Sequence, residues 1–234
     1  MKRLLLIAFP FMLLASSCST MNGVLNNSGL TQSEIASGLK EALILGSQSS
    51  SNRLSVVDGF FNNSLHKIWM PAEAQKVESA LRAVGLGATV DKAILAMNRA
   101  AEEAAKSAGS IFVDAIRQMT IQDAVRILRS GDTAATAFFR QVTTQRLFST
   151  FQPVINNALA KTQATQYWSE VFSLYNKISN KPVTTDLSAY VTNKAIDALF
   201  HELKNEEIRI RTEPAARVTE ILRKVFGSSL AQQR

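Results

Sequence analysis

The sequence predicts an all-α protein, an irregular bundle of about nine helices in a single domain. Apolar residues recur at intervals of three and four positions over most of the chain, as they do on one face of a helix. Helix-start and helix-stop residues divide the chain into segments of about 15–25 residues. Alternating patterns typical of strands are nearly absent, since the stretch 181–185 is too short to carry weight.

The first helix is expected over 31–46. Thr31 and Glu34 have the spacing of a capping box, in which each side chain pairs with a backbone amide at the start of a helix. Residues 47–63 are mostly polar and are predicted to form a loop.

The middle of the chain divides at helix-start and helix-stop residues. Pro71 suits the start of a helix, and Gly109 is expected to break one. Thr120 with Asp123 predicts another helix start, and Asp132 a further one. The helices predicted here cover 72–84, 90–104, 111–119, 120–131 and 132–151.

The last third is divided by two prolines and closed by a glycine. Pro153 is expected to restart the chain, Asp186 to cap the longest helix, and Pro214 to open the last one, which Gly227 ends. The helices predicted here cover 154–160, 168–178, 186–211 and 214–226. Residues 228–234 are expected to form a polar tail.

The first 17 residues have the pattern of a secretory signal peptide. Lys2 and Arg3 precede an apolar run over 4–14, which is shorter than the ~20 residues needed to span a membrane. Small residues then precede Cys18, the only cysteine. This arrangement resembles the lipobox of bacterial lipoproteins, which implies removal of residues 1–17 and lipidation of Cys18. The alternative is ordinary cleavage near Ser17, which would leave Cys18 a free thiol.

Lipidation would hold the chain at a membrane, because each buried methylene contributes ~0.8 kcal/mol. Residues 18–30 then form the lipidated cysteine and a flexible tether, and the helical domain occupies 31–227. Ser19 stands where aspartate would favour retention at the inner membrane. By resemblance to enterobacterial sorting, we expect the outer membrane, with the domain facing the periplasm.

The charge of the mature chain is modest. The 26 Lys and Arg residues include two in the signal peptide, so 24 remain beside 19 acidic residues, a net charge of +5. Because this excess is spread along the chain, nucleic acid is not an expected partner. The expected partners are the membrane, through Cys18, and an envelope protein or lipid.

Signatures of catalysis and cofactor binding are missing. His201-Glu202 begins like the zinc-protease motif H-E-x-x-H, but Asn205 occupies the second histidine position. With only His66 and His201 in the chain, a histidine-based zinc site is not expected, and His66 is predicted to pack in a loop beside Trp69. No nucleophile elbow, phosphate-binding loop or calcium loop occurs. We therefore predict no catalytic residue, metal or cofactor.

A set of polar residues lies beside the apolar stripes of the predicted helices. One interpretation is that they form ion pairs that fix helix packing, and the other is that they line a polar pocket between helices. They are Asn98, Arg99, Glu102, Asp114, Arg117, Lys194, Asp197 and Arg217.

Several short motifs together carry a family resemblance. They are 81–87, 97–102, 112–116, 119–120, 190–192, 194–195 with Asp197, 214–217 and 225–227. In combination they resemble the bacterial family catalogued as domain of unknown function 4197, over nearly all of residues 30–227. The resemblance implies a helical, exported and often lipidated protein without an established activity. The serine-rich stretch 47–51 departs from the family, in which a more helical continuation is expected.

Three functions remain open from the sequence. The first is a non-enzymatic interaction module that binds an envelope component. The second is a carrier or sensor of an apolar ligand such as a lipid, enclosed in a helical cavity. The third is an envelope hydrolase that uses carboxylates, which clustering of Glu102, Asp114 and Asp197 would favour.

Overall fold

The computed structural model describes residues 29–161, 165, 168–169, 176 and 186–232. The predicted signal peptide, Cys18 and most of the predicted helix 168–178 lie outside these residues. The part that is described confirms the all-α fold, since it contains helices and turns and no strand. No described helix is both long enough and apolar enough to cross a membrane.

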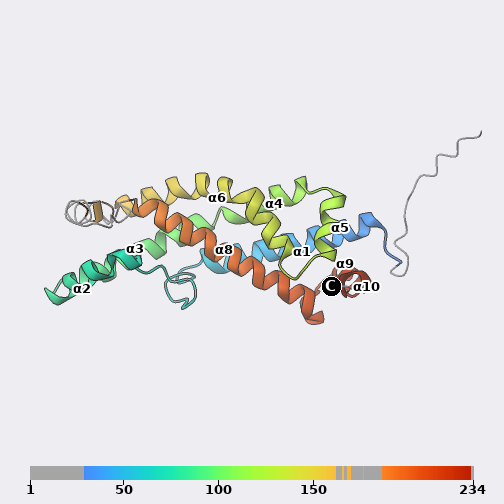
Figure 1. Ribbon diagram of the computed structural model, residues 1–234, viewed down its shortest axis with the longest axis horizontal. Coiled ribbons are helices and arrows are strands. Elements are labelled where there is room, and N and C mark those ends of the chain that lie inside the picture. The colour runs from blue at the N-terminus through green and yellow to red at the C-terminus, as the bar shows by residue number, and fades with distance from the viewer. Residues whose placement is uncertain (1–28, 162–164, 166–167, 170–175, 177–185, 233–234) are drawn as a thin grey trace, which may run out of the picture.

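Three long helices run along the length of an elongated bundle (Figure 1). They are α1 (Gln32–Ser55), α6 (Ala134–Lys161) and α8 (Leu187–Thr212), and α8 packs against both of the others. Helices α3 (Gly87–Ala105) and α4 (Ala108–Gln118) fill the space beside them. Helix α2 (Gln75–Ala83) lies at one end, and α5 (Ile121–Arg129), α9 (Glu220–Phe226) and α10 (Ser229–Gln232) lie at the other.

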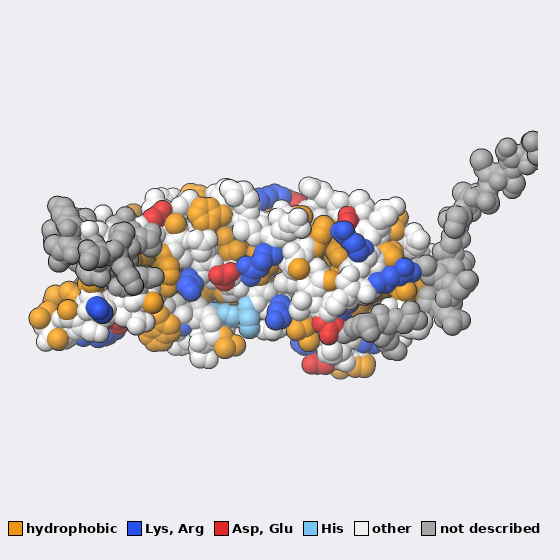
Figure 2. Space-filling model, in the orientation of Figure 1, with side chains coloured by type: hydrophobic (Ala, Val, Ile, Leu, Met, Phe, Trp, Pro, Cys, Tyr) orange, Lys and Arg blue, Asp and Glu red, His pale blue; other side chains and the backbone are white. Residues whose placement is uncertain are grey.

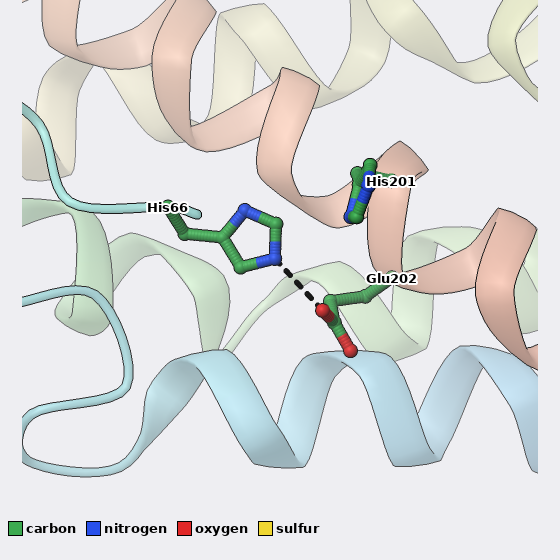
Figure 3. A group of neighbouring side chains, drawn as sticks. All are labelled: His66, His201 and Glu202. Atoms are coloured by element: carbon green, nitrogen blue, oxygen red, sulfur yellow. Dashed lines mark hydrogen bonds and ion pairs between the residues drawn. The ribbon is translucent and has the colours of Figure 1, made fainter. Parts of the chain in front are cut away.

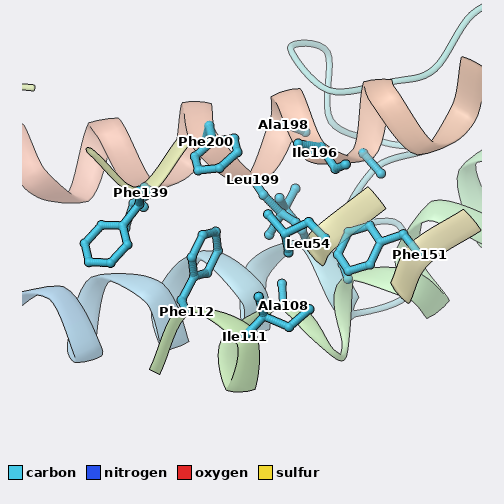
Figure 4. Close-up of a cluster of buried hydrophobic side chains, with 14 of the residues drawn as sticks. Leu54, Ala108, Ile111, Phe112, Phe139, Phe151, Ile196, Ala198, Leu199 and Phe200 are labelled. Carbon is cyan, nitrogen blue, oxygen red and sulfur yellow. The ribbon is translucent and has the colours of Figure 1, made fainter. Parts of the chain in front are cut away.

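The core is built from apolar side chains that meet between these helices. Phe112 of α4 lies edge-to-face against Phe139 of α6 and Phe200 of α8, with ring centroids 6.3 and 5.7 Å apart (Figure 4). All three rings are fully buried. Such pairs add about 0.5–1.5 kcal/mol to the stability gained by burial alone.

Helix α1 is longer than predicted, because residues 47–55 continue the helix instead of forming a loop. Ser50 donates to the carbonyl of Gly46 at 2.7 Å, and Ser51 donates to that of Ala105 at 2.8 Å. The serines are therefore small buried residues that let α1 approach its neighbours closely. Helical continuation here is what the family resemblance implied, and the polarity of the segment was misleading.

Two predicted breaks inside the chain are wrong. Gly109 lies within α4, and the break falls instead at Lys106-Ser107. Helix α6 runs through Pro153, although a proline inside a helix costs about 3 kcal/mol. The cost is offset because Leu147, Phe151, Ile155 and Leu159, spaced four apart across the proline, are all fully buried.

The C-terminal region also differs from the prediction. Pro214–Ala216 forms only a short 3-10 turn, and α9 begins later, where Thr219 accepts a hydrogen bond from the amide of Leu222. The expected polar tail contains α10, in which Leu230 and Ala231 are buried. By contrast, the predicted helix starts at Thr31, Thr120 and Asp186 are confirmed by side-chain hydrogen bonds to backbone amides.

Candidate functional site

The eight polar residues singled out in the sequence are not gathered in one pocket. Asn98, Arg99 and Glu102 share one face of α3 and contact the loop between α1 and α2. The remaining five lie on α4, α8 and the segment before α9, and their contacts are with other parts of the chain.

Those five residues join helices or face solvent. Asp114 pairs with Arg146 at 2.7 Å and Asp197 with Arg140 at 2.9 Å, so α4 and α8 are each linked to α6. Arg217 donates to the carbonyls of Ile210 and Arg211 and so closes the C-terminal end of α8. Lys194 lies over the ring of Tyr190, and Arg117 is exposed. Glu102, Asp114 and Asp197 therefore bind three different arginines and share no partner.

The loop between α1 and α2, residues 56–70, is held by buried polar groups of α3. Asn98 is fully buried. Its amide accepts from the backbone N–H of Ile68 at 2.8 Å and donates to the carbonyls of Ile68 and Ile94 at 2.9 and 2.7 Å. This pattern satisfies the amide of Asn98 and ties the end of the loop to α3.

Glu102 and Arg99 fix the start of the same loop. The buried Glu102 carboxylate accepts from the backbone amides of Phe60 and Phe61 at 3.1 and 3.3 Å. Arg99 bridges Glu102 and Asp58, at 2.7 Å to each. Its hydrogen bond with Glu102, followed by that with Asp58, raises the pKa of Arg99 above its ordinary value. Asp58 has a φ of 69°, in the left-handed region that aspartate adopts more often than most residues do.

The 56–70 loop, which α3 holds in this way, exposes large apolar side chains. The exposed fractions are 75% for Val57, 75% for Leu65 and 55% for Trp69. The ammonium of Lys67 lies 4.4 Å from the centroid of the Trp69 ring, and the hydroxyl of Tyr190 donates to the Trp69 carbonyl at 2.9 Å. Figure 1 shows the loop bulging from the side of the bundle. The backbone of the loop is therefore held by contacts with α3, while its large apolar side chains extend into solvent.

A second cluster joins this loop to α8 (Figure 3). His66 of the loop lies 2.7 Å, Nε2 to Oε1, from Glu202 of α8, and its ring centroid is 5.0 Å from that of His201. The other oxygen of Glu202 pairs with Nε of Arg53 on α1 at 3.1 Å. His66 is buried, Glu202 half-buried and His201 exposed, and histidine atoms reach the surface near the middle of the face in Figure 2.

Two buried charges form a third cluster, which joins helix ends. Glu207 accepts from the backbone amides of Ala135 and Thr136 at the start of α6. Arg211 pairs with Glu207 at 3.0 Å and donates to the carbonyls of Ile127 and Leu128 near the end of α5. Each charge complements the partial charge of the helix end that it meets. The role of this cluster is therefore to fix how α5, α6 and α8 pack against one another.

Among the described residues, the space between α1, α8 and α9 holds a cavity of only about 10 Å³, about the space of one water. Its lining is mostly apolar, with Glu207 and Arg211 as the charged members. An acyl chain would not fit it.

The second and third clusters depend on residues for which the sequence predicted no role in a site. We predicted His66 as loop packing, and we left Glu202, Glu207 and Arg211 without a role. His66 and Glu202 are separated by 136 positions, and no local spacing relates them. Trp69, three positions after His66, was the nearest signal in the sequence, since tryptophan is enriched at interfaces.

A family model described as "Protein of unknown function (DUF4197)" matches residues 29–227. Neither the curated proteins nor the solved structures contain a match. The match covers every element from α1 to α9, including the 56–70 loop and the segments that contact it.

Proposed function

The chain belongs to the family of proteins of unknown function DUF4197, and on that premise we propose that it is an exported lipoprotein whose helical domain binds another component of the cell envelope through its 56–70 loop. Lipid on Cys18 holds it at the membrane, and the outer membrane, periplasmic side, is its proposed location. The proposed partner is an envelope protein with an apolar surface. The domain acts by binding and not by catalysis.

The anchor is supported by the order of features at the start of the chain. A basic start, a short apolar run and small residues before the only cysteine are the pattern that lipoprotein processing requires. Acyl chains on that cysteine would confine the domain to the membrane surface, where encounters with membrane proteins are frequent.

The observation that carries the binding role is the contrast between the inside and the outside of the 56–70 loop. Asn98 and Glu102 are buried polar residues that fold onto this loop. The loop then exposes Val57, Leu65 and Trp69. Burying polar groups is costly unless they are paired, so this arrangement favours a loop preformed for a ligand. A partner that covers the three side chains would regain ~25 cal/mol for each Å² of apolar surface buried.

The anchor is tested by replacing the lipidated residue. Cys18→Ser should move the protein from the membrane pellet to the soluble periplasmic fraction and abolish incorporation of labelled palmitate. Ser19→Ala, at the adjacent position, is the control and should leave both the membrane association and the palmitate incorporation unchanged. Retention of Cys18→Ser in the pellet with undiminished palmitate labelling would reject the anchor.

The binding role is tested with a photo-crosslinking amino acid at Leu65 in intact cells. Val142 of α6 is the matched control, because it is an apolar residue that is 51% exposed and lies outside the loop. We expect a discrete crosslinked product from position 65, lost when Trp69→Ser is added, and none from position 142. The same products from both positions, or none from position 65, would reject the loop as the binding surface.

A further inference from the structure

We propose that His66, His201 and Glu202 form a binding site for a divalent first-row transition metal ion, with zinc as the ion that fits the ligands best. The site would join the 56–70 loop to α8. This inference does not depend on the loop having a protein partner.

The three side chains already lie within reach of one ion. Each offers one ligand atom, and these atoms all lie within 4.8 Å of one another. Zinc binds histidine nitrogen and carboxylate oxygen at about 2.0–2.2 Å, so two ligands of a tetrahedral site are about 3.4 Å apart. His66 and Glu202 are closer than this, at 2.7 Å, because they share a hydrogen bond. Small side-chain rotations, of which the exposed His201 is the freest, would open the space for the ion.

The donor set selects the class of metal. Two imidazoles and one carboxylate suit zinc and its first-row neighbours, whereas magnesium and calcium prefer oxygen ligands throughout. His66 forms the floor of the site, with a side chain only 4% exposed, and Glu202 is 12% exposed. Because His201 is exposed, a fourth position would remain open to water, as in zinc sites with three protein ligands.

Neighbouring side chains orient two of the ligands. The amide nitrogen of Asn205, Nδ2, lies 3.3 Å from Nδ1 of His201. A rotation of this amide by about 180° would bring its carbonyl oxygen to Nδ1, where it would accept the Nδ1 proton and leave Nε2 a lone pair for the metal. Arg53 holds the second carboxylate oxygen of Glu202 and leaves the first, Oε1, facing His66. Arg53 also pairs with Glu206, so its charge is shared between two carboxylates.

The test is a metal titration of the full chain, purified in detergent without a polyhistidine tag and stripped with a chelator. Isothermal titration with zinc and visible absorption with cobalt(II) report stoichiometry and ligand geometry. We expect one ion per chain with the absorption of a four-coordinate cobalt site. His201→Gln and Glu202→Gln should each weaken binding by at least ~10-fold. Glu213→Gln makes the same charge change at an exposed position of the chain and should bind as the unmodified protein does.

Two variants, His201→Gln and Cys18→Ser, keep the result unambiguous. His201→Gln changes an exposed side chain, so it tests the site even if replacement of the buried His66 prevents folding. Cys18→Ser removes the only cysteine, and binding must persist in it. Absence of saturable binding at one ion per chain, loss of binding in Cys18→Ser, or undiminished binding in both His201→Gln and Glu202→Gln would overturn the proposal and leave the cluster a hydrogen-bonded junction only.

Discussion

At the scale of single residues, Gly59 shows how closely the 56–70 loop is packed on the end of α1. A Cβ atom at this position would lie 2.6 Å from the carbonyl oxygen of Arg53 and 2.7 Å from that of Leu54. These are backbone atoms, which cannot rotate away. Gly59→Ala should therefore lower the free energy of unfolding by about 1–3 kcal/mol, measured by urea denaturation. Gly131→Ala, where nothing lies within 4 Å, should change it by less than about 0.5 kcal/mol, and equal effects would refute the close approach.

Glu34 gives a prediction about acid stability. Its hydrogen bond from Lys224, followed by those from Thr31, lowers the pKa of Glu34 from 4.5 to about 2. Because the pKa is lower in the folded state, the stabilisation is complete above pH 4.5 and is lost as the pH falls toward 2. In Glu34→Gln, the urea midpoint should therefore fall less steeply over this window than in the unmodified protein. Glu213→Gln should retain the original slope, and the same slope in all three proteins would contradict the assignment.

Local chemistry explains which residues were predictable. Thr31, Thr120 and Asp186 bond to amides three positions away, so their spacing in the sequence already contains the contact. His66 and Glu207 reach partners 136 and 71–72 positions distant. Only the packing of the helices defines those contacts.

At the scale of elements, α3 holds the end of the 56–70 loop through the amide of Asn98, while Glu102 and Arg99 hold its start. Asn98→Ala would leave the N–H and the carbonyl of Ile68 without their partner, at about 1–3 kcal/mol for each buried group left unpaired. We expect faster amide hydrogen exchange across 56–70 and little change in the centre of α6. Asn193→Ala, an exposed position of α8, is the control. Unchanged exchange in the loop would show that it is held by other contacts.

The junction of α5, α6 and α8 depends on a buried ion pair. Arg211→Met leaves the Glu207 carboxylate buried beside an apolar side chain, which should cost about 3–5 kcal/mol of stability. Arg209→Met removes a half-exposed arginine two positions away and should cost about 0–1 kcal/mol. Thermal unfolding of both variants compares the two losses of stability. Similar melting temperatures would mean that the pair of Arg211 and Glu207 does not stabilise the junction.

Helix ends were the least predictable feature of the elements. The sequence placed them at polar runs, glycines and prolines, whereas α1 continues through its serines and α6 through Pro153. In both cases burial decides the outcome. The apolar stripe of α6 keeps its spacing across the proline, and this spacing was a better guide to the helix than the proline was.

At the scale of the whole molecule, the all-α bundle followed from periodicity, but the place of the candidate site did not. Three of the eight polar residues, Asn98, Arg99 and Glu102, proved to support the site from inside, without lining it. Of the exposed apolar side chains on the loop, Val57 lies in the stretch 47–63 that was predicted as a polar loop, and Leu65 and Trp69 follow that stretch. The small cavity between α1, α8 and α9 and the loop held by α3 are the two features on which the proposed binding role rests.

The most direct test of this account is side-chain footprinting by hydroxyl radicals in native envelopes and on the purified chain. If the 56–70 loop is a binding surface, Leu65 and Trp69 should be modified several-fold less in envelopes, whereas Val142 and Val218, also exposed, should be modified equally in both. Equal modification of Leu65 and Trp69 in the two preparations would contradict the claim that the loop meets a partner.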